Sequence, residues 1–341
     1  MVEQATRSSE GGIVLSGMRA TGPLHLGHYF GAIKNWVELQ DRYSCHYCVA
    51  DWHALTTDYA DPSAIADNTL MTVADWLASG IDPDKSVIFL QSQVAEHAEL
   101  QLLLGMLTPL GWLERVPTYK EQIRQLDNKD LGTFGFLGYP VLQTADIILY
   151  RAHHVPVGQD QASHLELSRE ITRRFNKLYG RVFPEPQPLF TTTPKVPGLD
   201  GRKMSKSYGN AIELSDDADS IRAKCSKMFT DPTRARRDDP GHPETCNLFH
   251  FHRLLSPQAV QDDIAERCRA ATLGCVDDKG LIAERMIEFL RPIREKRQEL
   301  LADRGELFRM LSAGTERARQ AAQETMSLVR KAMGLDYKKW S

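Results

Sequence analysis

The sequence of 341 residues has no long apolar run and no surplus of charge of either sign. No stretch approaches the ~20 apolar residues that a membrane-spanning helix needs, which excludes an integral helical membrane protein. Lys and Arg number 42 against 45 Asp and Glu, a formal net charge of -3, so nucleic-acid binding would need local basic patches. Internal repeats and low-complexity tracts are also absent. With 42% hydrophobic residues, the chain is typical of a globular protein of roughly two domains.

Cysteine is scarce, and the first residues lack an apolar leader. Met1 to Gly12 are polar, so we expect residues 1–11 to form a flexible tail on a cytoplasmic protein. The six cysteines are then expected to be thiols or metal ligands, because disulfides belong to oxidising compartments. Cys45 and Cys48 lie in one predicted strand, where residues three apart point to opposite faces and cannot hold the same metal.

Short apolar runs alternate with helical periodicity in the first half of the chain. The predicted strands cover residues 13–15, 46–50 and 87–90, and the predicted helices follow at about 26–39, 63–79 and 96–108. This alternation predicts an α/β fold with a doubly wound, Rossmann-like parallel sheet and helices on both faces. Ligands of such sheets bind beyond the carboxyl ends of the strands, where the strand order reverses.

The character of the sequence changes after Asn210. From Ser215 onward it is charged and helical in pattern, most clearly at 284–301 and 314–333. We therefore expect a sheet domain followed by an all-helical domain, and the sequence leaves open whether the last turns pack back on the sheet. The expected division is 1–11 (tail), 12–208 (sheet domain), 209–335 (helical domain) and 336–341 (C-terminal tail).

A glycine-rich turn with two histidines, residues 21–28, joins the first strand to the first helix. Its glycines allow close approach of a ligand, and a helix start offers free N–H groups to a phosphate. His25 and His28 lie one helical turn apart, so both rings can face one ligand. A capping turn with surface histidines and half of a metal site are the alternatives.

The second motif is Lys203-Met204-Ser205-Lys206-Ser207, with glycines on both sides. A mobile loop with two ammonium groups and two hydroxyls suits the transfer of a polyphosphate, which is catalysed by positioning and charge. Alone, the motif could equally be a solvated basic linker. The two motifs in this order and context form the signature pair of the class I aminoacyl-tRNA synthetases.

From Leu15 to Leu335 the chain resembles the bacterial tryptophanyl-tRNA synthetases. The matching stretches are residues 15–17, 21–22, 114–120, 139–140, 145–150, 155–161, 164–166 and 173–176. The tyrosyl relatives share the fold, but the block 139–161 is more similar to the tryptophanyl enzymes. The resemblance implies ATP-dependent activation of tryptophan to tryptophanyl-adenylate and pyrophosphate, and then transfer to the 3′ end of tRNA(Trp).

The resemblance also implies a tryptophan site. Asp146 would accept the indole N–H, which is the polar group of a tryptophan side chain. Tyr139 and Gln161 would hold the substrate ammonium, and Leu15, Gly17, Val155 and Val157 would shape the ring pocket. A wrong substrate would leave the buried Asp146 unpaired, so discrimination against tyrosine and phenylalanine needs no editing domain.

An ATP site with Mg²⁺ is implied in the same way. Gly27, His28, Gly158 and Asp160 would hold adenosine, Val196 and Met204 would contact adenine, and Lys120, Lys203, Lys206 and Ser207 would stabilise the triphosphate. Ala20, Thr21, Gln159 and Ser205 complete the predicted ATP site, and His25 joins the catalytic set. The substrate carboxylate is ionised at pH 7, so attack on the α-phosphate needs orientation and charge neutralisation but no general base.

Three departures from the family pattern stand out. The chain keeps histidine at both 25 and 28, where many bacterial members have other residues. Arg19-Ala20 replaces a common glutamine-proline pair, which predicts a phosphate contact for Arg19 with a solvent-facing side chain as the alternative. Gln143 replaces a common methionine in the indole pocket, where it could offer a second polar contact to the ring N–H.

Three further cysteines fall in the helical domain. Cys246, Cys268 and Cys275 match three of the four ligands of an iron–sulfur site found in some relatives, and Asp278 stands in the fourth place. A remnant, a cluster with a carboxylate ligand and simple buried thiols are the alternatives. A bound cluster is not favoured, and no metal is assigned to the chain.

The resemblance implies two macromolecular partners, tRNA(Trp) and a second copy of the chain. Basic residues that could contact the tRNA backbone are Arg234, Arg236, Arg237, Arg291, Arg294, Lys296 and Arg297. Solvated helix faces paired with glutamates are the alternative. The apolar segment 102–112, within an expected insertion around 100–140, is the predicted homodimer interface.

Two functions from other classes compete with this prediction. A small-molecule adenylyltransferase shares the histidine turn but does not need a long helical domain. A synthetase-like regulator that only binds RNA would be expected to lose catalytic side chains, whereas His25, His28, Lys203 and Lys206 are all present.

Overall fold

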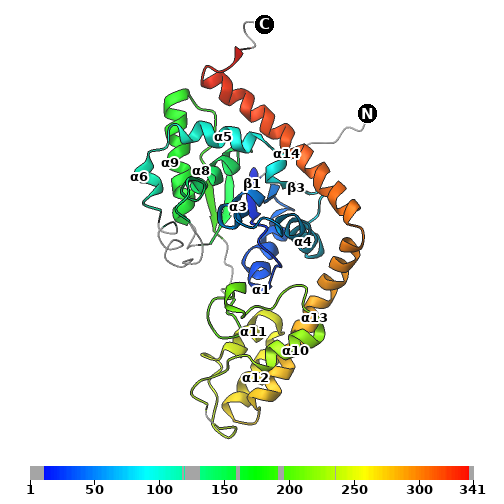
Figure 1. Cartoon of the computed structure of the whole chain (residues 1–341). Helices are drawn as coiled ribbons and strands as arrows, with labels where there is room; N and C mark the ends of the chain where they lie inside the picture. The colour runs from blue at the N-terminus through cyan, green and yellow to red at the C-terminus, as the bar shows by residue number, and fades with distance from the viewer. Residues whose placement is uncertain are drawn as a thin grey trace.

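A five-stranded, all-parallel sheet with the strand order β3-β2-β1-β4-β5 forms the centre of the protein (Figure 1). This computed structural model describes residues 11–116, 119, 131–158, 162–190, 196–234 and 236–337. The strands are β1 (Ile13–Met18), β2 (Ser44–Val49), β3 (Ser86–Leu90), β4 (His154–Val157) and β5 (Gln187–Phe190). The predicted doubly wound parallel sheet is thus confirmed, and its first three strands lie where the sequence placed them.

Helices cover both faces of the sheet, and each face has its own hydrophobic cluster. Trp36 and Trp76 pack on one face, and Leu100 and Ile148 pack on the other. The helices that supply these residues are α2 (Lys34–Leu39), α4 (Ile65–Ala78), α5 (Glu96–Gly105) and α8 (Phe134–Leu149), and α9 (Ala162–Tyr179) joins the second face. Buried strands with apolar residues on both faces are typical of parallel sheets of this kind.

The two cysteines of β2 belong to different faces. Cys45 is buried in the cluster that holds Trp36, and Cys48 is buried in the cluster that holds Leu100. The prediction that these side chains point away from each other is therefore confirmed, because successive side chains of a strand alternate between its faces.

The segment after β1 is not the single helix that its periodicity predicts. It consists of α1 (Leu26–His28), a π-helical turn η1 (Tyr29–Ile33) and then α2. Phe30 and Ile33 of the π-turn are both buried. Widened turns of this type are often found at functional sites, and this one directly follows the histidine turn.

Two short helices and two helical turns were not expected from the sequence pattern. They are α3 (Asp51–Asp58) directly after β2, η2 (Gln91–Gln93) directly after β3, α6 (Leu110–Leu113), and η4 (Lys206–Tyr208). α3 and η2 both start at the carboxyl ends of strands, so they bring polar residues to the edge of the sheet where ligands bind.

The second half of the chain is helical, as predicted. Its helices are α10 (Ala218–Ser226), α11 (Asn247–Leu255), α12 (Gln258–Arg269), α13 (Cys275–Ala302) and α14 (Arg304–Ala332). In Figure 1, α10–α12 lie at one end of the molecule, and α13 leads from them to α14, which runs along the sheet part. Across the described residues, no helix combines the length and apolar character needed to cross a bilayer.

Helix α14 packs directly on the edge strand β3. A Cβ atom at Gly314 would lie 2.0 Å from the carbonyl oxygen of Ile88, so only glycine permits this approach. The Leu90 amide donates a hydrogen bond to the Thr315 hydroxyl at 3.1 Å. The helix therefore covers the otherwise open edge of the sheet. The domain limits at residues 208 and 335 and the two tails stay predictions.

Candidate functional site

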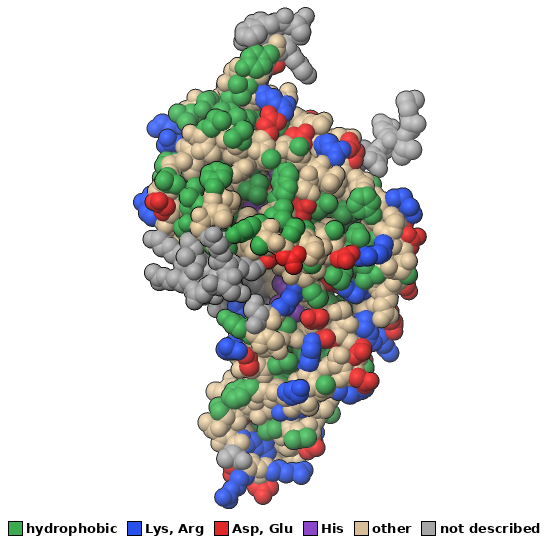
Figure 2. Space-filling model, in the orientation of Figure 1, with side chains coloured by type: hydrophobic (Ala, Val, Ile, Leu, Met, Phe, Trp, Pro, Cys, Tyr) green, Lys and Arg blue, Asp and Glu red, His purple; other side chains and the backbone are tan. Residues whose placement is uncertain are grey.

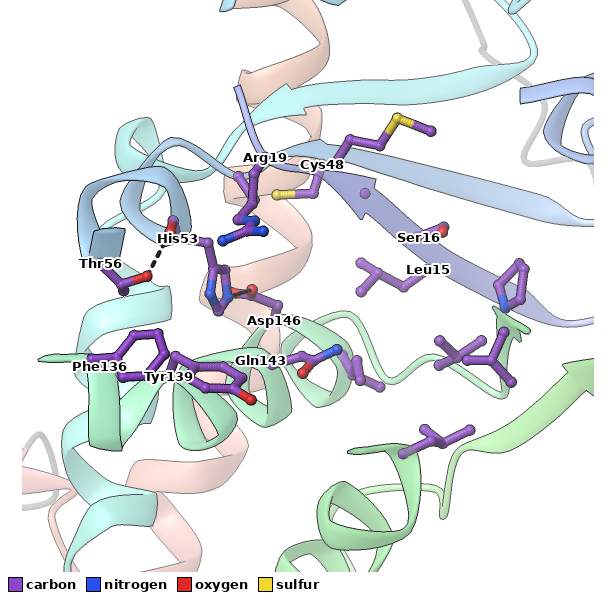
Figure 3. Close-up of a pocket in the computed structure, with 18 of the residues that line it drawn as sticks. Leu15, Ser16, Arg19, Cys48, His53, Thr56, Phe136, Tyr139, Gln143 and Asp146 are labelled. Atoms are coloured by element: carbon purple, nitrogen blue, oxygen red, sulfur yellow. Dashed lines mark hydrogen bonds and ion pairs between the residues drawn. The ribbon is translucent and has the colours of Figure 1, made fainter. Parts of the chain in front are cut away.

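A cavity of about 540 Å³ opens at the carboxyl ends of β1, β2 and β4 (Figure 3). It lies at the switch point where the chain continues to β2 on one side of β1 and to β4 on the other. The predicted residues that line it are Leu15, Gly17, Arg19, Tyr139, Gln143, Asp146, Val155, Val157 and Lys203. The structure thus brings together most of the predicted tryptophan site with two of the predicted phosphate-binding cations.

The apolar side of the cavity is formed by the ends of two neighbouring strands. Leu15 comes from β1, and Val155 and Val157 come from β4. Gly17 has a structural reason of its own, because a Cβ atom there would lie 2.5 Å from the carbonyl oxygen of Cys48 on β2. The polar side is formed by α8, whose residues Tyr139, Gln143 and Asp146 recur at helical spacing along one face.

Asp146 is the centre of a buried hydrogen-bond network at the closed end of the cavity. It accepts hydrogen bonds from His53 Nε2 at 2.9 Å, from His97 Nδ1 at 2.7 Å and from Gln91 Nε2 at 2.8 and 2.9 Å. The other ring nitrogen of His97 bonds to the Tyr150 hydroxyl at 2.7 Å. Burial alone would raise the pKa of Asp146, but the hydrogen bonds from the two histidines hold it below its usual value. The carboxylate is therefore ionised at neutral pH.

The sequence pattern did not reveal the three side chains that hold Asp146. Gln91 follows β3 directly, His53 follows β2 by four residues, and His97 lies in the first turn of α5. Polar residues just after the carboxyl ends of strands were the available signal for His53 and Gln91. His97 gave no such signal in the sequence, because a single histidine within a predicted helix has no distinctive spacing. The structure shows that it is fully buried.

The histidine turn is compact and its rings pack on each other. The ring centroids of His25 and His28 are 3.8 Å apart, and the His25 amide donates to His28 Nδ1 at 3.2 Å. A Cβ atom at Gly27 would lie 2.9 Å from the His25 ring, so a larger residue there would displace that ring. Burial, followed by the charge of Lys206, lowers the pKa of His25 to about 4. Burial, followed by His25 and Lys206, lowers the pKa of His28 to about 3, so both rings are neutral at pH 7.

The expectation of free amides at this helix start is wrong for two of its residues. The Leu26 amide donates to the Ile212 carbonyl at 2.9 Å, and the His28 amide donates to the His25 carbonyl at 2.8 Å. The turn is instead tied to the segment that follows residues 203–207, the lysine loop, since His25 and Glu213 also form an antiparallel bridge. The N–H groups of this three-residue helix are thus largely used within the chain.

The lysine loop is held by the buried side chain of Asn210. Its Oδ1 accepts from the Ser205 amide at 2.8 Å, and its Nδ2 donates to Asp200 at 2.7 Å and to the Lys203 carbonyl at 3.2 Å. A Cβ atom at Gly198 would fall on the Asn210 amide group, so glycine makes room for this anchor. Lys203 reaches the cavity from the loop.

Lys206 extends from the same loop over the histidine turn. A Cβ atom at Gly22, where φ is +122°, would lie 2.9 Å from its Nζ atom. Burial lowers the pKa of Lys206, and the carboxylates of Glu213 and Asp75 oppose that effect. The two motifs that are far apart in the sequence therefore share one site.

The remaining predicted ATP residues lie partly within and partly outside the described part of the chain. Ala20, Val196 and Met204 are buried in one hydrophobic cluster, while Thr21 is exposed. Contact of Val196 and Met204 with adenine stays a prediction. Lys120, Gln159, Asp160 and the side chain of Ser207 lie outside the described residues, as does Gln161 of the predicted tryptophan site, whereas Gly158 directly follows β4.

The cysteine site of the helical domain does not fit an iron–sulfur cluster. Cys246, Cys268, Cys275 and Asp278 line a cavity of only about 10 Å³, which is room for no more than one water molecule. Asp278 already accepts a hydrogen bond from His252 at 3.1 Å. Burial raises the pKa of the Cys246 and Cys268 thiols. The described residues contain no group of three or more side chains placed to hold a metal ion.

An arginine occupies the position between two of these thiols. The Arg234 guanidinium lies 4.0 Å from the Cys268 Sγ atom and 3.8 Å from the Cys275 Sγ atom. Arg234, predicted to contact tRNA, is therefore turned inward. Arg297, also predicted to contact tRNA, is turned inward as well, because it forms an ion pair with the buried Asp75 at 2.6 Å. These two residues are removed from the predicted tRNA contacts.

Comparison with known proteins agrees with the site. The family model described as tRNA synthetases class I (W and Y) matches residues 8–291. The chain belongs to this family. A tryptophan–tRNA ligase of Thermotoga maritima is 51% identical over 94% of this chain and 99% of its own length. The tryptophan–tRNA ligase of Aquifex aeolicus is 44% identical, with 94% and 99% covered.

A solved synthetase shows the same fold. The tryptophanyl-tRNA synthetase of Campylobacter jejuni, in complex with ADP and tryptophan, superposes with a TM-score of 0.88 at 35% identity, covering 95% of this chain and 100% of that one. A tyrosyl-tRNA synthetase of Archaeoglobus fulgidus reaches a TM-score of 0.64 at 21% identity, which shows the shared fold alone. The chain is thus similar to the tryptophan branch of its family over nearly its whole length.

Proposed function

We propose that this chain activates L-tryptophan with ATP to tryptophanyl-adenylate and pyrophosphate and then transfers tryptophan to the 3′ end of tRNA(Trp) in the cytoplasm. The observation that carries this proposal is the buried carboxylate of Asp146 in a cavity whose other side is an apolar wall of strand residues. An indole ring is apolar except for one N–H donor, and this cavity offers an apolar wall with one anionic acceptor. The tryptophan–tRNA ligases that resemble the chain support the same substrate.

The network around Asp146 gives the cavity its selectivity. Because His53, His97 and Gln91 fix the carboxylate, it does not have to reorganise when the indole N–H arrives. Because these three side chains already donate to Asp146, phenylalanine would not leave the carboxylate unpaired, contrary to the expectation from the sequence. Phenylalanine would instead lack the additional charge-assisted hydrogen bond that the indole N–H makes. Tyr139 and Gln143 lie along the same wall, where they can contact the polar part of the substrate.

The phosphate side of the site is cationic. Arg19 and Lys203 line the cavity, and Lys206 lies over the histidine turn. The neutral rings of His25 and His28 can donate hydrogen bonds to a triphosphate without adding charge, and Lys203 and Lys206 neutralise the leaving pyrophosphate. Mg²⁺ would arrive bound to ATP, and it supplies further neutralisation of the phosphate charge.

We also propose that the chain acts as a homodimer. Leu102, Met106, Leu110 and Phe134 are 61%, 73%, 58% and 82% exposed. Figure 2 shows hydrophobic side chains gathered over the part of the molecule where α5 and α6 lie in Figure 1. An exposed apolar patch of this kind is typical of a protein interface. Arg236 and Arg291 are exposed and could contact tRNA, whereas the exposed Lys296 pairs with Glu299 at 3.1 Å.

The proposed reaction is tested by tryptophan-dependent exchange of labelled pyrophosphate into ATP, without tRNA. We expect exchange with tryptophan and none with tyrosine. Exchange with tyrosine alone would assign the cavity to the sister branch of the family. No exchange with either amino acid would refute the proposed activation step and favour a regulator that binds RNA.

A further inference from the structure

Asp75 and Arg297 form a buried ion pair between two helices that are far apart in the sequence. Asp75 belongs to α4 and Arg297 to α13, and the Arg297 Nε atom donates to the Asp75 Oδ1 atom at 2.6 Å. The Asp75 side chain is 1% exposed and the Arg297 side chain is 12% exposed. A pair so deeply buried usually contributes little net stability compared with apolar residues of the same size. A role in positioning neighbouring groups would account for its presence at this place in the fold.

The second oxygen of Asp75 faces the histidine turn. Its Oδ2 atom accepts a hydrogen bond from the Leu24 amide at 3.4 Å. The Leu24 carbonyl in turn accepts from the Leu214 amide at 2.9 Å, and the neighbouring His25 pairs with Glu213. Asp75 therefore holds one side of the short backbone segment that carries the first signature histidine.

Lys206 is the other cation that acts on Asp75 among the described residues. The charges of the two groups influence each other, with Lys206 favouring the ionised form of Asp75 and Asp75 favouring the ionised form of Lys206. Burial raises the pKa of Asp75 to about 6, against the opposing effects of Arg297, Leu24 and Lys206. Without Arg297, the buried carboxylate would either take up a proton or pair with another cation, and Lys206 is the cation within its electrostatic reach.

We propose that Asp75 and Arg297 are positioning residues for ATP activation, with Arg297 holding the Asp75 carboxylate on the Leu24 amide and so leaving Lys206 free for the triphosphate. The proposal rests on the proposed function of Lys206. Neither residue lines the tryptophan cavity. Their effect is therefore expected on ATP and not on tryptophan.

The decisive experiment compares Arg297→Met with the double variant Asp75→Asn/Arg297→Met. Misplacing a reacting group by about 1 Å costs on the order of 100-fold in rate. We expect Arg297→Met to lower kcat/KM for ATP in pyrophosphate exchange by about 10- to 100-fold, with KM for tryptophan unchanged. The double variant should recover most of the loss, because the introduced amide still accepts from Leu24 but no longer attracts Lys206.

Asp67→Asn provides a matched control on the same helix. Asp67 also pairs with an arginine of the C-terminal helices, Arg304, at 2.7 Å, but this pair is exposed. We expect its kinetics to equal those of the wild type. All variants are assayed at a temperature where circular dichroism shows them folded, and Arg297→Lys, with an expected intermediate loss, replaces Arg297→Met if that variant does not fold.

Two results would overturn the proposal. One is a wild-type kcat/KM for ATP in Arg297→Met, and the other is a double variant at least as impaired as Arg297→Met, which indicates a structural role only. Equilibrium binding of ATP, measured by isothermal titration calorimetry, needs no turnover. The affinities of the variants for ATP should follow the same order as their kcat/KM values for ATP. A wild type without exchange would thus refute the proposed function, while ATP binding would still test the pair.

Discussion

Replacing Asp146 by asparagine would remove the charge of the carboxylate that lines the cavity while keeping its shape. The introduced amide oxygen could still accept hydrogen bonds from Gln91 and His97, which are 2.8 and 2.7 Å from the Asp146 Oδ1 atom in the wild type. The introduced N–H₂ group would face His53, whose ring can present an acceptor nitrogen in one of its tautomers. The variant is therefore expected to fold.

The expected loss follows from the energy of a hydrogen bond to a charged group. Such a bond contributes about 1.5–3 kcal/mol, compared with about 1 kcal/mol for a neutral pair. Because each 1.36 kcal/mol corresponds to about tenfold in rate, loss of the full charged interaction would lower kcat/KM for tryptophan by about 10- to 100-fold. KM for ATP should stay unchanged, since Asp146 lies at the end of the cavity that is proposed to hold the indole.

The assay is pyrophosphate exchange with tryptophan varied at saturating ATP. A tryptophan analogue with sulfur in place of the ring N–H provides a second test, because wild type should prefer tryptophan by about 10-fold or more and Asp146→Asn should lose that preference. Asp51→Asn is the matched control, since Asp51 accepts from the Trp52 and Ser92 amides beside the cavity without lining it. An unchanged preference in Asp146→Asn would refute the assigned role.

Three further predictions concern stability and assembly. Gly314→Ala should lower the free energy of unfolding by about 1–3 kcal/mol, because the added Cβ would clash with β3. The control Gly280→Ala in α13 has open space around the added Cβ and should raise the free energy of unfolding slightly. Chemical denaturation measures both values. Phe134→Asp should give monomers in light scattering, because Phe134 is exposed within the proposed interface. Val276 is equally exposed but lies elsewhere, so Val276→Asp should leave the dimer intact. Dimers in both variants would contradict the proposed interface. The pKa values of His25 and His28 are lowered in the folded protein, so the unfolded chain binds more protons below pH 6.5. The free energy of unfolding should therefore fall as the pH drops from 6.5 toward 4, partly offset by the raised pKa of Asp75. A free energy of unfolding that stays constant across this range would contradict the burial of the two rings.

Much of the fold could be predicted because its signals are local. The strands at 13–18, 44–49 and 86–90 each contain a short apolar stretch, and the helices α13 and α14 have clear amphipathic periodicity. β4 and β5 have four residues each and were not predicted as strands, since so short a segment has no distinctive pattern. The π-turn after β1 escaped for a different reason, because its apolar spacing is also that of an ordinary helix.

Residue patterns alone were enough to establish the alternation that produces a parallel sheet and the two signature motifs. These are properties of neighbouring residues, so spacing and residue type reveal them. Asp146 was singled out by the resemblance to the family and not by a residue pattern. The folded chain was needed to show which side chains hold Asp146, where Lys206 lies and that Arg234 fills the space between two cysteines. Asp75 and Arg297 are separated by 222 positions. Contacts over such distances arise from the packing of whole helices on the sheet, and no local pattern in one sequence contains them.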